Sequence, residues 1–225
     1  MYSAVLRIIA ITAGCLILGV FAVFFIRTMG LKQNFAPPPH KWFENTEWRI
    51  WNPPGCVPGP APNGWIRAIT VHSKNGEWLD ECGQPVAESI KDASDVLLIV
   101  KATETELLDK LVENVGAFDR TKRFAVAAEA QRVARSLRHK APQWIFAADS
   151  ASLMRLRLFS GLWIETAIDF WPDFVIATSS GSHAFEPRMR QELTRRGRRI
   201  VWQGEAAPYP VQGFMSPSTT DGLPK

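Results

Sequence analysis

The stretch DVLLIVKATETELLDKLVENVGAFDRTKRFAVAA, residues 95–128, decides the fold class because it contains a complete strand–helix–strand unit. Residues 96–100 and 124–127 are apolar runs typical of strands that are buried on both faces. Between them, residues 105–118 repeat apolar side chains at helical spacing, which predicts a helix. We expect Thr103 to cap the start of this helix and Glu104 and Glu106 to lie in its first turn. A helix that joins two buried strands indicates a parallel sheet.

The same alternation continues on both sides of this unit. Further strands are predicted at 66–71, 144–146, 174–177 and 200–202. Further helices are predicted at 129–139, at 150–160 with Asp149 or Ser150 as its cap, and at 187–196 with Gly197 at its end. The pattern predicts an α/β fold and leaves two architectures open, a (β/α) barrel and an open doubly wound sheet.

A hairpin is predicted within WIRAITVHSKNGEWLDECG, residues 65–83, because Asn75-Gly76 is a strong turn signal between two β-rich runs. No glycine-rich phosphate loop follows its first strand. SSGSH at 179–183 follows a strand and precedes a helix, where backbone amides can hold an anion, but we interpret it as a plain loop.

The N-terminal segment carries an uncharged run at residues 8–26, about 28 Å long as a helix, which matches the hydrocarbon core of a bilayer. A cleaved signal peptide does not fit, because its apolar core is shorter and ends in small residues. A lipoprotein signal ending at Cys15 does not fit, because the apolar run continues beyond it. We therefore predict a single-pass transmembrane anchor at 1–29, a juxtamembrane linker at 30–64 and a barrel domain at 65–225.

The linker is rich in proline and tryptophan. Its proline clusters at 36–40 and 52–64 exclude a helix or a central strand there. Between the clusters lie four aromatic residues, for which we expect either the membrane headgroup level or packing on the domain: Trp42, Phe43, Trp48 and Trp51.

The net charge and the cysteines limit which partners and which cellular compartment are expected. The formal net charge is only +4, and the basic runs at 120–123 and 195–199 lack the interleaved aromatics of a nucleic-acid platform, so we expect no nucleic acid partner. Cys56 and Cys82 lie outside the anchor, and such a pair suits one disulfide in an oxidising compartment. Charges flanking the anchor do not decide its orientation, but the cysteines favour a domain outside the cytoplasm.

Five stretches carry a resemblance to a known family, namely 95–103, 118–147, 156–177, 189–205 and 213–225. Among them are DVLLIVKAT, which resembles a strand ending in Glu-x-Lys, and MRQELTRRGRRIVWQGE, which resembles a late helix followed by a strand ending in Trp. Over residues 63–225 the chain resembles the glycerophosphodiester phosphodiesterase family of TIM-barrel enzymes. Of the two open architectures, the resemblance implies the barrel, here a shortened TIM-like (β/α) barrel. The resemblance implies that carboxylates on the C-terminal face hold calcium or magnesium, while two histidines act as general base and acid.

The positions that would carry this chemistry are substituted. Arg67 and Ile69 stand where the resemblance implies a Glu-x-Asp pair of metal ligands, and a guanidinium cannot ligate a cation. Ile99 stands at a third ligand position, and Lys101 alone is retained from the Glu-x-Lys pair. Asp80 follows the hairpin without the expected histidine. The sequence therefore predicts no metal site.

Three residues remain as candidates for an altered hydrolase: Glu44, His72 and Asp80. Glu44 begins Glu-Asn-Thr, which matches part of a family motif, with His40 four residues before it. His72 is the histidine nearest the predicted barrel rim, and His139 and His183 are interpreted as surface residues.

The anchor followed by a proline cluster resembles the arrangement in membrane-anchored bacterial members of this family. This resemblance implies a single-pass protein of a bacterial inner membrane, with the domain in the periplasm. We expect no catalytic residue and no cofactor, and binding of a lipid head group or phosphate through Lys101 and Arg67, or of a membrane protein partner. One alternative is an active phosphoric diester hydrolase that uses a divalent cation such as calcium or magnesium. Another is an accessory subunit of a membrane protein complex.

Overall fold

The computed structural model describes residues 2–33, 42, 47–53, 55, 61–119, 121–178, 186–204 and 206–216, with side chains from residue 9 onward. Its helices are α1 (Tyr2–Leu31), α2 (Val86–Ile90), α3 (Leu108–Gly116), α4 (Gln131–Lys140), α5 (Ser150–Gly161), the 3-10 helix η2 (Glu165–Ala167) and α6 (Pro187–Arg195). Its strands are β1 (Trp48–Trp51), β2 (Ile66–Lys74), β3 (Glu77–Asp80), β4 (Asp95–Lys101), β5 (Arg123–Ala128), β6 (Ile145–Phe146), β7 (Phe174–Thr178), β8 (Arg199–Gln203) and β9 (Gly213–Met215).

The sheet is a nearly closed parallel barrel. Its order is β6-β5-β4-β2-β1-β9-β8-β7, and an isolated parallel bridge between Ala147 and Phe174 joins the two ends. β3 pairs antiparallel with β2 through a turn in which Asn75 and Gly76 have φ of 53° and 78°, as predicted for an Asn-Gly hairpin. The predicted α/β barrel is thus confirmed, and the open doubly wound sheet is excluded.

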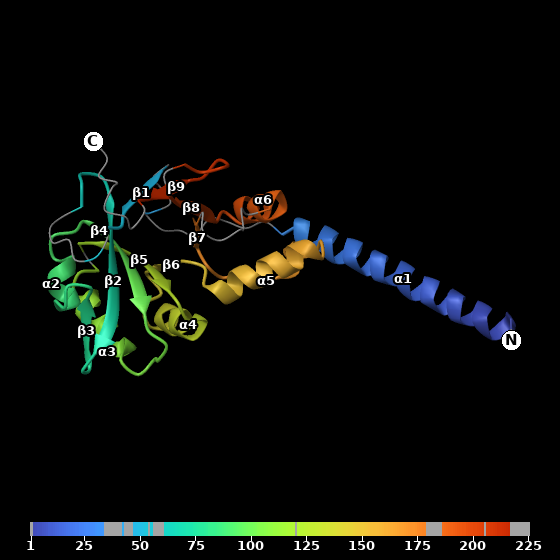
Figure 1. Cartoon of the computed structure of the whole chain (residues 1–225), viewed down its shortest axis with the longest axis horizontal. Coiled ribbons are helices and arrows are strands. Elements are labelled where there is room, and N and C mark those ends of the chain that lie inside the picture. Colours follow the sequence, from blue (N-terminus) through green and yellow to red (C-terminus); the bar gives the residue numbers. More distant parts are fainter. Residues whose placement is uncertain are drawn as a thin grey trace.

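Side chains of alternate strand positions fill the barrel lumen. The inward positions of neighbouring strands form one apolar cluster, including Ala68 of β2, Leu97 of β4, Phe174 of β7 and Val201 of β8. The outward positions of β2, β4 and β5 pack instead under α2, α3 and α4, while those of β7 and β8 pack under α5 and α6. Figure 1 shows the helices around the sheet. The lumen is therefore a packed core rather than a pore.

The segment before residue 65 contributes a strand to the barrel. β1 lies between β2 and β9, although the sequence analysis placed residues 48–51 in a linker. Trp48 is only 1% exposed, its Nε1 donates to the Trp42 carbonyl at 2.8 Å, and its ring meets Phe174 edge-to-face. Trp42 and Trp51 are also buried, so these three aromatics pack on the domain rather than at the headgroup level; Phe43 lies outside the described residues.

The predicted helices are present, but two of them, α3 and α4, begin at later residues than predicted. The Asp149 side chain accepts from the Ser152 amide at 2.8 Å and caps α5, as one of the two predicted caps. The Thr103 cap is wrong, because α3 begins at Leu108 and its N-cap residue Leu107 makes no side-chain cap. Glu104 and Glu106 therefore lie in the loop before α3 and not in its first turn. Gly197, with φ of 66°, follows the end of α6 as predicted.

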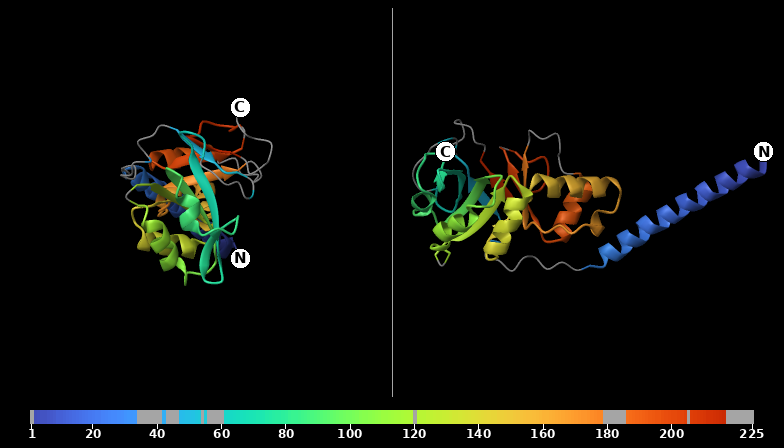
Figure 2. Two further views of the ribbon diagram at one scale, coloured as in Figure 1. Left: turned by 90° about the vertical axis from the view of Figure 1, so that its left-hand side faces the viewer. Right: turned by 90° about the horizontal axis from the view of Figure 1, so that it is seen from below.

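The helix α1 is long and apolar enough to cross a membrane, by length and composition. It projects from the domain, and its C-terminal end meets η2 (Figures 1 and 2). Gly30 is buried against Thr166 of η2, and the Arg195 guanidinium of α6 donates to the Gln33 carbonyl at 2.8 Å. The end of α1 is thus docked on the domain.

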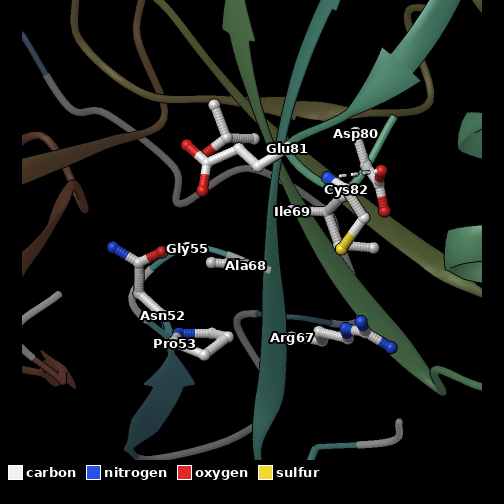
Figure 3. A pocket seen from close by; sticks show the side chains of 10 residues that line it. Asn52, Pro53, Gly55, Arg67, Ala68, Ile69, Asp80, Glu81 and Cys82 are labelled. Atoms are coloured by element: carbon white, nitrogen blue, oxygen red, sulfur yellow. Dashed lines mark hydrogen bonds between the residues drawn. The ribbon is translucent and has the colours of Figure 1, made fainter. Parts of the chain in front are cut away.

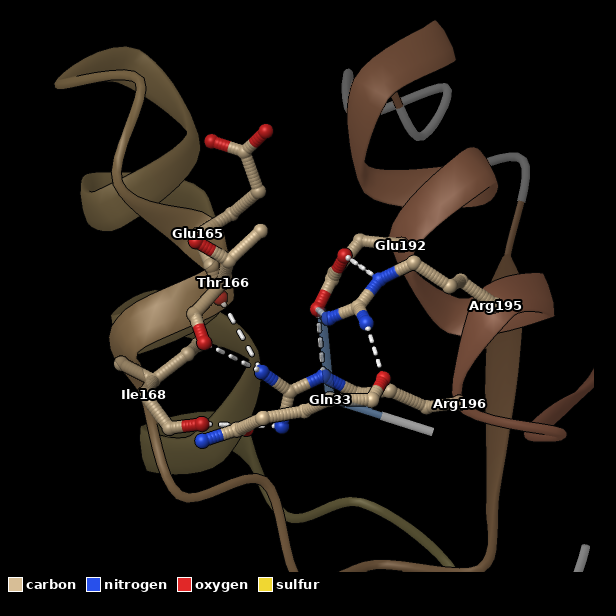
Figure 4. A network of polar contacts seen from close by, with 7 residues as sticks. All are labelled: Gln33, Glu165, Thr166, Ile168, Glu192, Arg195 and Arg196. Carbon is tan, nitrogen blue, oxygen red and sulfur yellow. Dashed lines mark hydrogen bonds and ion pairs between the residues drawn. The ribbon is translucent and has the colours of Figure 1, made fainter. Parts of the chain in front are cut away.

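A buried ion network holds this docking site together (Figure 4). Glu192 of α6 and Arg196, the residue that follows this helix, are 4% and 2% exposed, and Arg196 Nε donates to Glu192 at 2.6 Å. The Arg196 guanidinium also donates to the carbonyls of Glu165, Thr166 and Ile168. Burial by itself raises the pKa of Glu192, but the hydrogen bonds and charges of Arg195 and Arg196 lower it on balance.

Candidate functional site

The C-terminal ends of the strands form the mouth of the barrel, which is where barrel proteins of this type build their sites. His72 and Lys101 lie there at neighbouring register positions of β2 and β4, and Glu129 directly follows β5. The β2–β3 hairpin and α3 stand beside this mouth, at the end of the domain away from α1 (Figures 1 and 2).

A cavity of about 430 Å³ opens between the hairpin, the β4–α3 loop and the end of β5. We call it the mouth cavity, and it is lined by Ser73, Trp78, Lys101, Ala102, Thr103, Glu104, Glu106, Leu107 and Glu129. Its lining carries one ammonium group and three carboxylates, so its net charge is negative. The wall residue Trp78 is fixed, because it is buried and its Nε1 donates to the Leu107 carbonyl at 2.8 Å.

Lys101 lies at the rim of the barrel with its side chain 51% exposed. Its Nζ is 3.5 Å from Glu81 Oε1, so the ammonium is paired with a carboxylate. The strand alternation gives Lys101 the same direction as the lumen residues Leu97 and Ile99. A half-exposed pair of this kind contributes little to stability, so Lys101 is available to a ligand.

Arg67 does not join Lys101. On β2 the lumen positions are Ile66 and Ala68, while Arg67 and Ile69 lie on the opposite face of the strand, as Figure 3 shows. Burial lowers the pKa of Arg67, and the charges of Asp80 and Asp92 oppose this shift. The two residues predicted to bind one ligand therefore lie on opposite faces of the sheet.

The carboxylate of Asp80 is occupied by the turn that follows β3. Oδ1 accepts from the amides of Cys82 and Gln84, both at 2.8 Å, and Oδ2 accepts from the Ser89 hydroxyl at 2.7 Å. Asp80 pairs with Val71 in register and so lies on the face opposite to His72. The structure therefore does not bring these two hydrolase candidates together, and the third, Glu44, lies outside the described residues.

The structure describes only one of the two cysteines in the predicted disulfide. Cys82 is disulfide-bonded and lines a small crevice with Asn52, Thr70 and Glu81 (Figure 3). Cys15, in α1, is a free thiol. Cys56, the predicted partner of Cys82, lies outside the described residues, so the pairing stays a prediction. Residues 179–183, predicted to form a loop, and His183 among them also lie outside the described residues.

Within the part of the chain that the structure describes, no three His, Cys, Asp or Glu side chains are grouped so as to hold a metal ion. The inward positions of β2 near the mouth are Thr70 and His72, neither of which is a carboxylate. The expectation of no metal and no cofactor remains a prediction.

A second hollow, of about 450 Å³, lies outside the barrel beside α4. It is lined by Arg135, Arg138, His139, Asp169 and Trp171, and its charge is positive, in contrast to the mouth cavity. Arg138 is committed to structure, because it donates to the Trp171 carbonyl and to Asp173, both at 3.0 Å. His139 therefore lines a surface hollow, where the sequence analysis expected a surface residue.

The acidic residues of the mouth cavity were not singled out from the sequence as a site. Their signal is positional, because Glu104 and Glu106 follow β4 and Glu129 follows β5, so the ends of two parallel neighbours bring them to one edge. Comparisons of the chain with family models, curated proteins and solved structures found no match. The fold and the cavity therefore carry the functional inference alone.

Proposed function

We propose that this chain is a membrane-anchored barrel protein, related in architecture to glycerophosphodiester phosphodiesterases, that binds a zwitterionic head group at the mouth cavity without hydrolysing it. The observation that carries this proposal is the composition of the mouth cavity, with one ammonium group beside three carboxylates.

This charge pattern favours a ligand that carries both signs. A phosphodiester group is attracted to Lys101, and an amine is attracted to Glu104, Glu106 and Glu129. A simple phosphate dianion gains one favourable charge and faces three unfavourable ones. Because these side chains are exposed, each contact contributes at most about 1 kcal/mol, and the expected affinity is about millimolar.

The position of the cavity restricts the ligand further. The mouth lies at the end of the domain away from α1, so the head group of a lipid still in the same bilayer is remote from it (Figure 1). We therefore favour a water-soluble glycerophosphodiester such as glycerophosphoethanolamine. The disulfide state of Cys82 supports a domain outside the cytoplasm, in the periplasm if the anchor lies in a bacterial inner membrane.

The proposal that the ligand is not hydrolysed is supported by the hydrogen bonds and positions of the candidate catalytic residues. Asp80 accepts three hydrogen bonds from its own turn and lies on the face opposite to His72. Neither residue is arranged to share one substrate with the other, which a general acid–base pair requires.

The test is calorimetric titration of the full chain in detergent with glycerophosphoethanolamine, in parallel with glycerol 3-phosphate. We expect weaker binding of the anion, and Glu129→Gln should weaken binding of the zwitterion by about threefold to tenfold. Glu113→Gln is the matched control, because Glu113 is exposed on α3 and does not line the cavity.

Two outcomes would contradict the proposal. In one, the anion binds as tightly as the zwitterion and Glu129→Gln has no effect. In the other, Arg135→Ala abolishes binding, which would move the site to the basic hollow beside α4.

A further inference from the structure

The described residues concentrate their exposed apolar side chains outside α1 in a single place. Among them, every exposed large apolar residue beyond α1 lies within α5 or directly after it: Met154, Leu158, Leu162 and Trp163, with 74%, 59%, 56% and 52% exposure. We call these four residues the α5 patch. Singly exposed apolar residues need no explanation, but a cluster restricted to one helix face marks an interaction site.

The spacing of the patch makes it a continuous stripe. Met154, Leu158 and Leu162 are four residues apart, so they follow one face of the helix, while Leu156 and Ser160 are buried on the other face. α5 itself contains Arg155 and Arg157 and no acidic residue. A helix with an apolar face and basic flanks is suited to the interface of an anionic bilayer.

Trp163 links the patch to the end of α1. Its ring lies under two guanidinium groups, with Arg27 of α1 at 5.3 Å and Arg188 of α6 at 3.4 Å from the centroid. Arg27 directly follows the uncharged run of α1, so it marks the level at which the hydrocarbon region ends. A tryptophan in contact with this arginine is therefore at headgroup level, where its amphipathic ring is favoured.

The backbone of Trp163 adds an independent observation. Its φ of 62° is in the left-handed region, which costs a bulky residue free energy. The amides of Trp163 and Ile164 donate to the carbonyls of Ser160 and Phe159 at 3.1 and 2.9 Å and hold this conformation. The chain thus maintains a strained conformation at a residue whose large side chain is left exposed, which points to a role outside the domain.

We infer that the α5 patch lies in the headgroup region of the bilayer that α1 enters, with Trp163 and Leu162 deepest and Met154 most shallow. This inference rests on the proposed membrane anchor. It places the C-terminal end of α5 at the bilayer and the mouth cavity in water, because this end of α5 lies near the end of α1 while the hairpin lies at the far end (Figures 1 and 2).

The test places a photoreactive phenylalanine analogue at single positions of the full chain in nanodiscs of phosphatidylcholine with about one quarter phosphatidylglycerol. Leu158 and Leu162 probe the patch, Leu18 probes the anchor, and Glu113 on α3 is the exposed control. We expect lipid adducts at Leu18 and Leu162, fewer at Leu158, and about tenfold fewer at Glu113.

The possible outcomes distinguish a failure of this inference from a failure of the proposed transmembrane anchor. Adducts at Leu18 without adducts at Leu158 and Leu162, or adducts there to a second protein copy instead of lipid, would overturn the inference and leave the anchor intact. No lipid adduct at Leu18 would overturn both.

A second variant separates membrane contact from a structural role of Trp163. Asn tolerates the left-handed region, so Trp163→Asn should leave the midpoint of thermal unfolding unchanged, while the lipid adduct yield at Leu162 falls about threefold. A fall in thermal stability with an unchanged adduct yield would show that Trp163 serves the fold alone and would overturn its place in the patch.

Discussion

Gly30, at the end of α1, lies so close to Thr166 of η2 that an added Cβ would come within 2.4 Å of the Thr166 Cβ. Gly30→Ala therefore forces the helix off its docking site, and we expect it to destabilise the full chain by about 1–3 kcal/mol in urea unfolding in detergent. Gly19→Ala is the control, because nothing lies within 4 Å of a Cβ at Gly19. Equal stability of the two variants would argue against docking.

The buried ion pair of α6 gives a pH dependence. The pKa of Glu192 is lowered in the folded protein, so its contribution is complete above the unfolded value of about 4.3 and is lost as the pH falls through the folded pKa. Urea midpoints should therefore decrease below about pH 4.3.

Glu192→Gln should remove this component of the acid sensitivity. At neutral pH it should lower the free energy of unfolding by about 3–5 kcal/mol, because it leaves the Arg196 charge buried without a carboxylate partner. Glu186→Gln, an exposed change at the start of the same helix, should cost less than about 1 kcal/mol. An unchanged pH profile in the Glu192 variant would refute the assignment.

Asp80 is predicted to be structural. Asp80→Ala removes the acceptor for two backbone amides and the Ser89 hydroxyl, and we expect a loss of about 1–3 kcal/mol in thermal unfolding. Glu81→Ala, the neighbouring carboxylate that pairs with exposed Lys101, should cost about 0–1 kcal/mol. A stable Asp80 variant would return Asp80 to the list of candidates for catalysis.

Two tryptophans, one in the barrel lumen and one on the surface, should respond differently to replacement by alanine. Trp48→Ala opens a void in the barrel lumen and should cost about 3–5 kcal/mol, because Trp48 contacts Trp42 and Phe174 there. Trp163→Ala should cost less than about 1 kcal/mol, since Trp163 is half exposed. Denaturant unfolding of both variants measures the difference, and similar costs would contradict the assignment of β1 to the barrel core.

The alternation of apolar strands and amphipathic helices was sufficient to predict a parallel α/β sheet, because burial on both faces imposes that pattern on parallel strands. The choice of a barrel over a doubly wound sheet came from the family resemblance. β1 was not predicted. Its four residues carry no long apolar run, and proline clusters flank them, so its partners β2 and β9 supply the only strong determinant of its structure.

The site was harder to predict than the fold. Alternation alone does not say which face of a nearly apolar strand is inward, so Arg67 and Lys101 were assigned to one ligand although they lie on opposite faces. The acidic lining at Glu104, Glu106 and Glu129 depends on the register of β4 with β5, which no local sequence pattern encodes.

The central claim is that the mouth cavity recognises a zwitterionic head group and leaves it intact. Incubation of the full chain with phosphorus-labelled glycerophosphoethanolamine, followed by equilibrium dialysis and analysis of the phosphorus species, measures both properties together. We predict saturable retention at about millimolar affinity, weakened by Glu129→Gln and not by Glu113→Gln, with all ligand recovered as the diester. Release of glycerol 3-phosphate, or retention that ignores the Glu129 change, would contradict the claim.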